Sequence, residues 1–242
     1  MKTISEIGIN ILGNLITVVV LFIIGWFFFV FFGRRKLVSF FGVDHEKILR
    51  IYVGSVSNAG TPKGYVGFEE ISEAKNLEGL FKSVIPGLAD QPGLLKFFQV
   101  ADIQTMILPA APDSKDVTLA HSLISLGCPW SNFASSLLEK ELRSPVKFNW
   151  DPFFLQIPRL PPITAENQGI VVKICRGDRH YFYIAGKLET TTAGCARFLI
   201  QNWKLMRKKY GDKTSFYYLL EVKNDSMRGV DSIGNDELQI AE

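Results

Sequence analysis

The longest apolar pattern in the chain lies near its N-terminus, where apolar positions follow one another almost without interruption from Ile11 to Phe32. No ionisable side chain stands between Glu6 and Arg34. A helix of about 20 apolar residues crosses the hydrocarbon core of a bilayer and satisfies its own backbone hydrogen bonds there. The pattern therefore predicts a transmembrane anchor over residues 1–33.

The charges beside this segment predict its orientation. Arg34, Arg35 and Lys36 follow the apolar run, whereas Lys2 precedes it, so the positive-inside rule places the N-terminus outside and the C-terminal domain in the cytosol. We expect a single-pass protein of the plasma (inner) membrane. A cleavable signal peptide is the alternative, but the run exceeds the roughly 7 to 15 apolar residues of such peptides and no small-residue cleavage site follows it.

Residues 34–47 are expected to form a juxtamembrane connector, apolar enough at Phe40 and Phe41 to rest on the membrane interface. Beyond it, short β-branched and aromatic runs alternate with segments whose apolar residues recur every three or four positions. Strands are predicted at 48–53, 103–108, 122–126, 170–175, 180–185 and 216–222, and amphipathic helices at 68–84, 133–142 and 195–206. In the first helix Phe68 belongs to the apolar face, with Glu69, Glu70 and Glu73 opposite.

Two segments do not follow these periods. Residues 145–168 contain five prolines and are expected to be an irregular packed segment or short edge strands. Residues 224–242 are polar and are expected to be a disordered tail. The remaining span, 48–223, has room for one domain.

Strands that alternate with helices imply an α/β fold in which helices cover both faces of a largely parallel sheet. The short linker between 170–175 and 180–185 predicts a hairpin, which makes the sheet mixed. We therefore expect an N-terminal transmembrane helix followed by one three-layer α/β domain with a mixed, mostly parallel sheet.

Charge and cysteine content narrow the possible partners. The net charge is +3 and the basic residues are dispersed, so no nucleic acid partner is expected. The three cysteines, Cys128, Cys175 and Cys195, lack zinc-site spacing and are interpreted as reduced, buried thiols, which predicts no metal site.

Ligands of such sheets bind beyond the carboxyl ends of the strands, where helix N-termini present N–H groups. Three glycine-containing turns are expected to meet there and to bind a polar ligand bearing phosphate or sugar. Their candidate residues are Gly54, Ser55, Ser57, Asn58, Gly127, Ser131, Asn132, Gly186, Lys187, Thr190, Thr191 and Thr192. Lys63, Arg176, Arg179 and Lys187 are candidates to neutralise ligand charge. The alternative is that these residues are only helix caps and turn residues.

No motif indicates a specific catalytic chemistry or cofactor. The stretch around Gly186 lacks the first glycine and the hydroxyl residue of a P-loop, and there is no G-x-G-x-x-G or G-x-S-x-G sequence. Cys128 could act as a nucleophile with His121 or His180 as its base, but the sequence favours the interpretation of Cys128 as a buried thiol. Glu69 and Glu70 point in different directions on a helix, which favours a surface face over a catalytic pair.

The stretches Leu126-Gly-Cys-Pro-Trp-Ser-Asn132 and Ala185-Gly-x4-Thr-Thr-Ala-Gly-Cys-Ala196 carry a resemblance. Together with the anchor and the Gly-Phe-Glu-Glu helix at 67–70, they resemble uncharacterised bacterial membrane-anchored Rossmann-like domains of the nucleotide-sensor type found in defence and signalling. Relatives that process nucleotides would show a Gly-Gly-x-Gly-Thr loop, from which Gly186-Lys-Leu-Glu-Thr190 departs.

The resemblance implies a membrane-tethered sensor or effector that recognises a nucleotide-like ligand and is more plausibly a binding module than an enzyme. The alternatives are a membrane-anchored nucleotide or nucleoside hydrolase and a structural anchor for a protein partner. Gly13, Asn14 and Thr17 in the anchor favour helix–helix contact, so a homo-oligomer is expected beside the lipid bilayer as partner.

Overall fold

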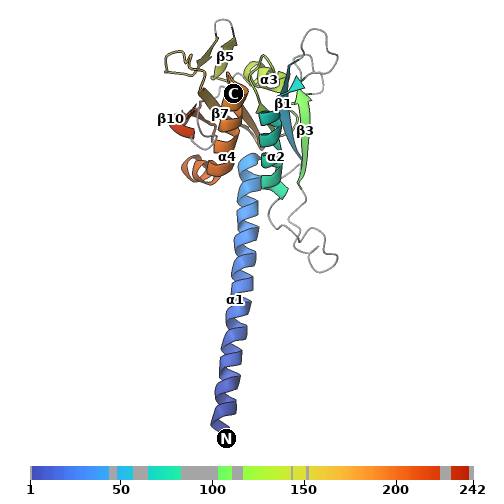
Figure 1. Ribbon diagram of the computed structural model, residues 1–242, viewed down its shortest axis with the longest axis vertical. Coiled ribbons are helices and arrows are strands. Elements are labelled where there is room, and N and C mark those ends of the chain that lie inside the picture. The colour runs from blue at the N-terminus through green and yellow to red at the C-terminus, as the bar shows by residue number, and fades with distance from the viewer. Residues whose placement is uncertain are drawn as a thin grey trace.

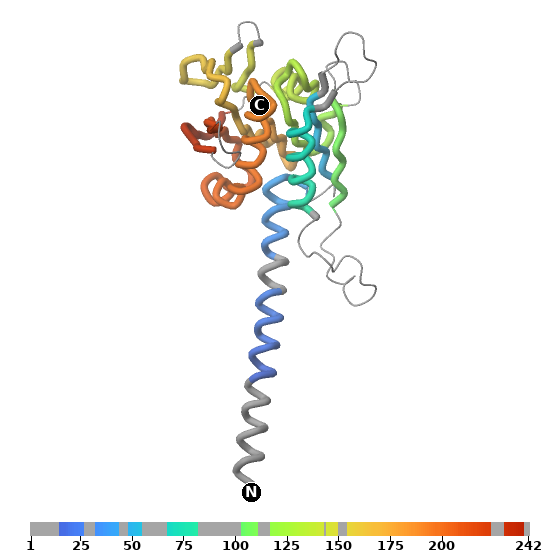
Figure 2. The backbone as a smooth tube through the Cα atoms, viewed as in Figure 1, coloured from blue at the N-terminus to red at the C-terminus, as the bar shows by residue number. Residues whose placement is uncertain are grey.

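The computed structural model consists of a long N-terminal helix that projects from a layered α/β domain (Figure 1). The structure describes residues 2–43, 48–56, 65–82, 103–110, 117–142, 144–150, 153–223 and 230–239. Figure 2 draws in grey the residues outside these ranges and also residues within them, such as 27–31, whose side chains are not described. Among these residues, side chains are described from residue 15 onward, apart from those at 27–31, 55, 56, 65, 66, 82, 150 and 153.

The elements follow one another largely as the hydrophobic pattern predicts. The helices are α1 (Lys2–Phe41), α2 (Phe68–Lys82), α3 (Phe133–Glu141) and α4 (Glu189–Tyr210). The strands are β1 (Ile48–Val56), β2 (Tyr65–Val66), β3 (Gln104–Ala110), β4 (Leu123–Leu126), β5 (Lys147–Trp150), β6 (Phe153–Gln156), β7 (Gln168–Arg176), β8 (Arg179–Gly186), β9 (Phe216–Val222) and β10 (Val230–Glu237).

Eight of these strands form one sheet in the order β10-β9-β7-β8-β4-β1-β2, with β3 also paired to β1. The pairs β1–β3, β1–β4 and β4–β8 are parallel, whereas β7–β8, β7–β9, β9–β10 and β1–β2 are antiparallel. Because β9 is antiparallel to β7 and β7 to β8, five of the eight strands point the same way. The α/β class and the mixed, mostly parallel sheet are therefore confirmed.

Helices cover both faces of the sheet, as Rossmann-like domains arrange them. On one face α2 and α4 pack side by side with the end of α1, and their apolar residues form one core with the inner side chains of the sheet. On the other face, α3 and the segment around β5 and β6 enclose a second core. The two cores give the domain its three layers.

The last turns of α1 belong to the domain. The helix continues to Phe41 without a break, and both Phe40 and Phe41 are fully buried in the first core. The ring centre of Phe40 lies 5.5 Å from the ring centre of Phe182 and 6.1 Å from that of Trp203. The expectation that this aromatic pair rests on a membrane interface is wrong, because the sheet and α4 offer it a drier, closely packed environment.

Among the described residues, no helix is both long enough and apolar enough to cross a bilayer.

Two further expectations are corrected or refined by pairing between distant segments. Residues 230–237 form β10, an edge strand hydrogen-bonded to β9, so this part of the tail is ordered in spite of its polar sequence. Residues 147–156 contain a two-stranded sheet, β5–β6, which agrees with the alternative of short strands.

The face of α2 also differs from its predicted pattern. Phe68 is 84% exposed, while Glu70 and Glu73 are buried. The helix is therefore rotated so that two of its carboxyl groups point into the molecule. Their partners, described below, come from α4 and from the end of β1.

Candidate functional site

A pocket lies where the parallel strands β1, β4 and β8 reach their carboxyl ends and where α2, α3 and α4 begin. Its volume is about 150 Å³. The turns predicted to converge do meet here. The lining residues are Gly54, Gly67, Glu70, Cys128, Trp130, Ser131, Gly186, Lys187, Leu188, Glu189 and Thr192.

The structure brings together five of the twelve candidate residues as lining of this pocket: Gly54, Ser131, Gly186, Lys187 and Thr192. Gly127 adjoins it, because a Cβ built there would lie 3.5 Å from Oε1 of Glu70.

Other candidates lie elsewhere. Thr190 is exposed and does not line the pocket. Ser57, Asn58, Lys63 and the side chain of Ser55 lie outside the described residues.

Glycine permits the close approach of the turns at two positions. A Cβ at Gly54 would lie 2.9 Å from Oγ of Ser131, closer than real side chains come. Gly127 adopts a φ of +116°, a conformation that residues with a Cβ rarely take. Gly54 lies near the end of β1 and Gly127 follows β4, so the glycines keep the floor of the pocket open.

Asn132 and Thr191 support the pocket from behind. The Asn132 amide donates to the carbonyls of Tyr52, at 3.1 Å, and Leu126, at 2.7 Å, and its Oδ1 accepts from the N–H of Ala134. Thr191 donates to the carbonyl of Glu166. Both side chains are buried, so they hold the strand ends and the helix starts in place without facing a ligand.

Two carboxyl groups that sequence reasoning did not assign to the site line the pocket. Glu70 is only 7% exposed, and burial raises its pKa from 4.5 to about 8, with the nearby charge of Glu189 acting in the same direction. A hydrogen bond with the backbone of Gly54 opposes this shift. Glu70 therefore carries a proton at neutral pH, contrary to the expectation of a solvated surface carboxylate.

Glu189 connects the beginnings of two helices. It stands in the first turn of α4, and its Oε1 accepts a hydrogen bond of 2.6 Å from the N–H of Glu69 in the first turn of α2. The positive end of the α2 dipole favours a negative charge at this point. One signal was present in the sequence, because Glu189 lies inside the predicted turn 186–192. For Glu70 there was no such signal.

Of the described basic residues expected at this edge, Lys187 is found there and Arg176 and Arg179 are not. Lys187 lines the pocket and forms an ion pair with Glu166. Arg176 and Arg179 flank the β7–β8 turn, at the opposite edge of the sheet, so their assignment to the ligand site is wrong. The sheet register separates them because a hairpin turn lies at the start of β8, whereas the pocket lies at its end.

Cys128 has no histidine base among the side chains that line the pocket. Its sulfur lies 3.7 Å from Oγ of Ser131. His180 begins β8 at the far edge, where its Nδ1 is 3.0 Å from the carbonyl oxygen of Phe40. Within the described part of the chain, no group of three or more His, Cys, Asp or Glu residues is placed to hold a metal ion.

Trp130 adds an aromatic surface at the rim of the pocket. Its side chain is 52% exposed and follows Cys128 in the turn before α3. A half-exposed indole beside a polar pocket provides a flat surface against which a planar ring can stack. The site thus combines two carboxyl groups, a thiol, two hydroxyls, an ammonium group and an indole around three helix N-termini. Comparisons of the chain with known protein families, curated proteins and solved structures gave no match.

Proposed function

We propose that this protein is a membrane-tethered binding module, a sensor or effector, that recognises a nucleotide-like ligand at the carboxyl edge of its sheet. One observation carries the proposal: three glycine turns from separate parts of the chain converge on a pocket that places Trp130 beside the carboxyl groups of Glu70 and Glu189. This combination fits the nucleoside part of a nucleotide better than its phosphates.

The chemistry of the lining supports that assignment. In dinucleotide-binding α/β folds an acidic side chain at this edge accepts hydrogen bonds from ribose hydroxyls. Glu189 can do so here, while protonated Glu70 can both donate and accept. The indole of Trp130 offers a stacking surface for the base. Phosphates would lie outside the carboxyl groups, towards Lys187 at the start of α4.

The size of the pocket agrees with enclosure of only part of a nucleotide-like ligand. Sites for drug-sized ligands have volumes of roughly 300–1,000 Å³. The volume of about 150 Å³ suits one ring or one sugar. The ligand would therefore extend beyond the pocket into solvent.

The surface of α1 supports the membrane tether. From Leu15 to Trp26 each large apolar side chain of this helix is at least 45% exposed. Such a continuous apolar surface is costly in water and stable in lipid. We propose that α1 spans the plasma membrane with its N-terminus outside and the domain in the cytosol, and that ligand binding changes self-association of the anchors.

A thermal-shift screen of the full-length protein in nanodiscs tests the binding function. Nucleosides, nucleoside monophosphates and dinucleotides serve as probes, since a ligand at a hundred times its Kd stabilises the folded state by about 2.7 kcal/mol. We expect stabilisation by at least one of these compounds, and at least a tenfold loss of affinity in Trp130→Ala and Glu70→Gln.

Glu139→Gln is the matched control, because Glu139 is a half-buried carboxyl group that also has a raised pKa but lies outside the pocket. It should bind like the wild type. Equal losses in Glu70→Gln and Glu139→Gln would contradict the proposed site, and so would the absence of any stabilising nucleotide.

A nucleoside or nucleotide hydrolase is the second candidate, favoured by the protonated state of Glu70 beside Glu189. A carboxylic acid that retains its proton at neutral pH can act as general acid on a glycosidic leaving group, and a second carboxylate can assist the attacking water. Product analysis of the screening mixtures separates turnover from binding. If the compounds neither bind nor are turned over, the third hypothesis remains, in which the protein is a structural anchor for a protein partner.

A further inference from the structure

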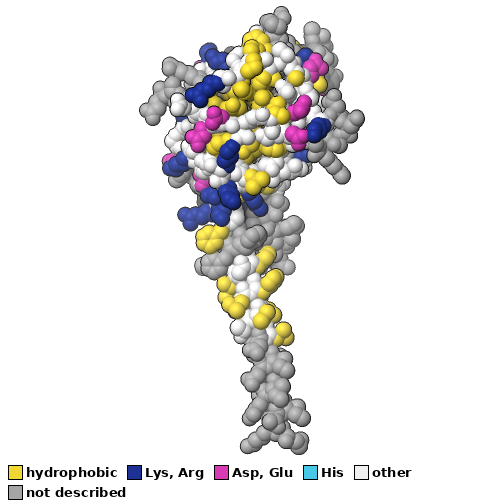
Figure 3. All heavy atoms as spheres, turned by 90° about the vertical axis from the view of Figure 1, so that its left-hand side faces the viewer, with side chains coloured by type: hydrophobic (Ala, Val, Ile, Leu, Met, Phe, Trp, Pro, Cys, Tyr) yellow, Lys and Arg dark blue, Asp and Glu magenta, His cyan; other side chains and the backbone are white. Residues whose placement is uncertain are grey.

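The end of the domain from which α1 emerges carries an excess of basic side chains. In Figure 3, Lys and Arg gather at the foot of the domain around its junction with the helix. The exposed basic residues of α1, of the end of α4 and of the neighbouring turns at this end are Arg35, Lys36, Arg176, Arg179, Lys204, Lys208, Lys209 and Lys213.

Acidic side chains at this end do not balance these charges. Asp178, Asp236 and Glu237 are exposed here and Glu78 is half-buried, so that among the described residues the exposed bases outnumber them two to one. Asp212 forms an ion pair with Arg207 and adds no net charge.

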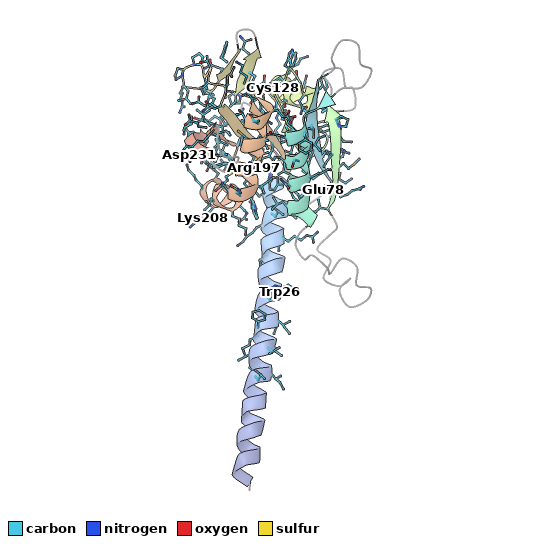
Figure 4. The ribbon with its side chains drawn as sticks, in the orientation of Figure 1. Trp26, Glu78, Cys128, Arg197, Lys208 and Asp231 are labelled. Atoms are coloured by element: carbon cyan, nitrogen blue, oxygen red, sulfur yellow. The ribbon has the colours of Figure 1, made fainter. Side chains whose placement is uncertain are left out.

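Among the pocket-lining side chains there is no such excess of bases, since Lys187 forms an ion pair with Glu166 and Glu189 adds a carboxylate. Figure 4 shows the separation, with Cys128 of the pocket far from α1 and Lys208 close to the place where α1 leaves the domain.

The end of α4 adds an apolar side chain to the basic surface. Leu205 is 64% exposed and lies between the exposed residues Lys204 and Lys208. A leucine among lysines on a helix surface is typical of segments that lie in the headgroup region of a membrane, where the apolar group enters the acyl boundary and the ammonium groups contact phosphates. We define Lys204, Leu205, Lys208 and Lys209 as the α4 patch.

The α4 patch is held at a fixed position relative to α1. The ring of Phe40 contacts Trp203, which directly precedes the patch, and Ser39 donates a hydrogen bond of 3.0 Å to Asp212, which follows α4. The Phe40–Trp203 contact is part of the buried core, so α1 cannot change direction without disrupting it. If α1 crosses a bilayer, the α4 patch is directed at the same membrane surface.

We propose that the α4 patch, together with Arg35 and Lys36, binds the anionic phospholipid headgroups of the membrane that α1 spans, with Leu205 inserted among them. This inference rests on the proposed membrane tether and is independent of the ligand in the pocket. It keeps the pocket on the side of the domain away from the membrane, open to the cytosol. The charge complementarity identifies the partner as an anionic lipid surface.

The test uses the full-length protein in nanodiscs of phosphatidylcholine, with and without phosphatidylglycerol. Binding of anionic lipid to the folded state stabilises it, so the wild-type unfolding midpoint should rise by roughly 2–4 °C with phosphatidylglycerol at low salt and lose this rise at high salt. Lys204→Glu/Lys208→Glu should abolish the rise. The matched control Lys75→Glu/Lys140→Glu, two exposed lysines on α2 and α3, should keep it.

A second measurement reports directly on Leu205. The fluorophore bimane is attached to Leu205→Cys in a variant whose three native cysteines are replaced. Brominated phosphatidylglycerol should quench its fluorescence. The quenching should be lost when Lys204→Glu/Lys208→Glu is added. An unchanged midpoint and an unquenched label in discs that contain the protein would overturn the lipid-contact proposal alone. Failure of the chain to enter nanodiscs would instead overturn the membrane tether.

Discussion

At the scale of single residues, Glu70 concentrates the chemistry of the candidate site, and its ionisation predicts a pH dependence of stability. The folded-state pKa of about 8 exceeds the ordinary value of 4.5, so the folded protein holds a proton that the unfolded chain releases between these values. Stability should therefore decline as pH rises from about 4.5 to 8 and level off above it. Relative to the wild type, Glu70→Gln should gain on the order of 1–3 kcal/mol at the upper end of this range.

Urea unfolding at several pH values measures this effect. Glu139 contributes a similar decline, since burial raises its pKa to about 7 against the hydrogen bonds that it accepts from Tyr183 and Phe148. Glu70→Gln should remove one part of the decline of unfolding free energy with pH. The double variant Glu70→Gln/Glu139→Gln should remove both parts. A wild-type slope retained in Glu70→Gln would mean that this carboxyl group is solvated.

At the scale of elements, the contact between α2 and α4 combines apolar packing with one ion pair. Glu73 is 3% exposed and accepts hydrogen bonds from Nε and Nη2 of Arg197, with the amide of Asn76 on its other oxygen. Removal of one partner of a buried pair leaves the other uncompensated, so Glu73→Ala should cost about 3 kcal/mol of unfolding free energy.

Equilibrium unfolding with two comparison variants tests this interpretation. Asp231→Ala removes an exposed ion pair with Lys223 and should cost less than about 1 kcal/mol. Glu73→Leu/Arg197→Met, which replaces both charges by apolar groups, should recover much of the loss. A Glu73→Ala protein as stable as Asp231→Ala would show that the pair is effectively solvated.

The junction between α1 and the domain gives a second prediction at this scale. Phe40 is fully buried among aromatic rings, and Nζ of Lys173 lies 4.3 Å from the centre of its ring. Phe40→Ala should therefore lower the unfolding free energy by about 3–5 kcal/mol. Phe32→Ala, at a position that is 46% exposed on the same helix, is the control and should change it little. Equal losses of unfolding free energy in both variants would show that α1 does not unfold together with the domain.

At the scale of the whole molecule, the charges beside α1 predict its orientation. A C-terminal fusion to a fluorescent protein should fluoresce in bacterial cells, and a fusion to alkaline phosphatase, which is active only outside the cytosol, should stay inactive. Replacement of Arg34, Arg35 and Lys36 by glutamine should increase the phosphatase signal, because the asymmetry of charge is lost. A wild-type fusion with full phosphatase activity would reverse the proposed topology.

The sequence could predict the edge of the sheet at which the pocket lies but not the side chains that give it its character. The turns after β1, β4 and β8 had to meet because parallel strands end at one edge. Glu70, in contrast, points inward because α2 packs on α4, and this burial is the main cause of its raised pKa. Glu189, which adds to the rise, accepts the N–H of Glu69 although the two residues are 120 positions apart in the sequence. A helical period seen in isolation assigns Glu70 to the solvent face.

The amino-acid sequence by itself determined the order of helices and strands, the α/β class and the three glycine turns, because periodicity and turn chemistry act over a few neighbouring residues. Only the tertiary structure decided that Phe40 enters the core, that the polar segment 230–237 pairs with β9, and that Glu70 and Glu189 line the pocket beside Lys187. These outcomes depend on which distant segments become neighbours, since burial and backbone pairing are set by the partner surface and not by the local pattern.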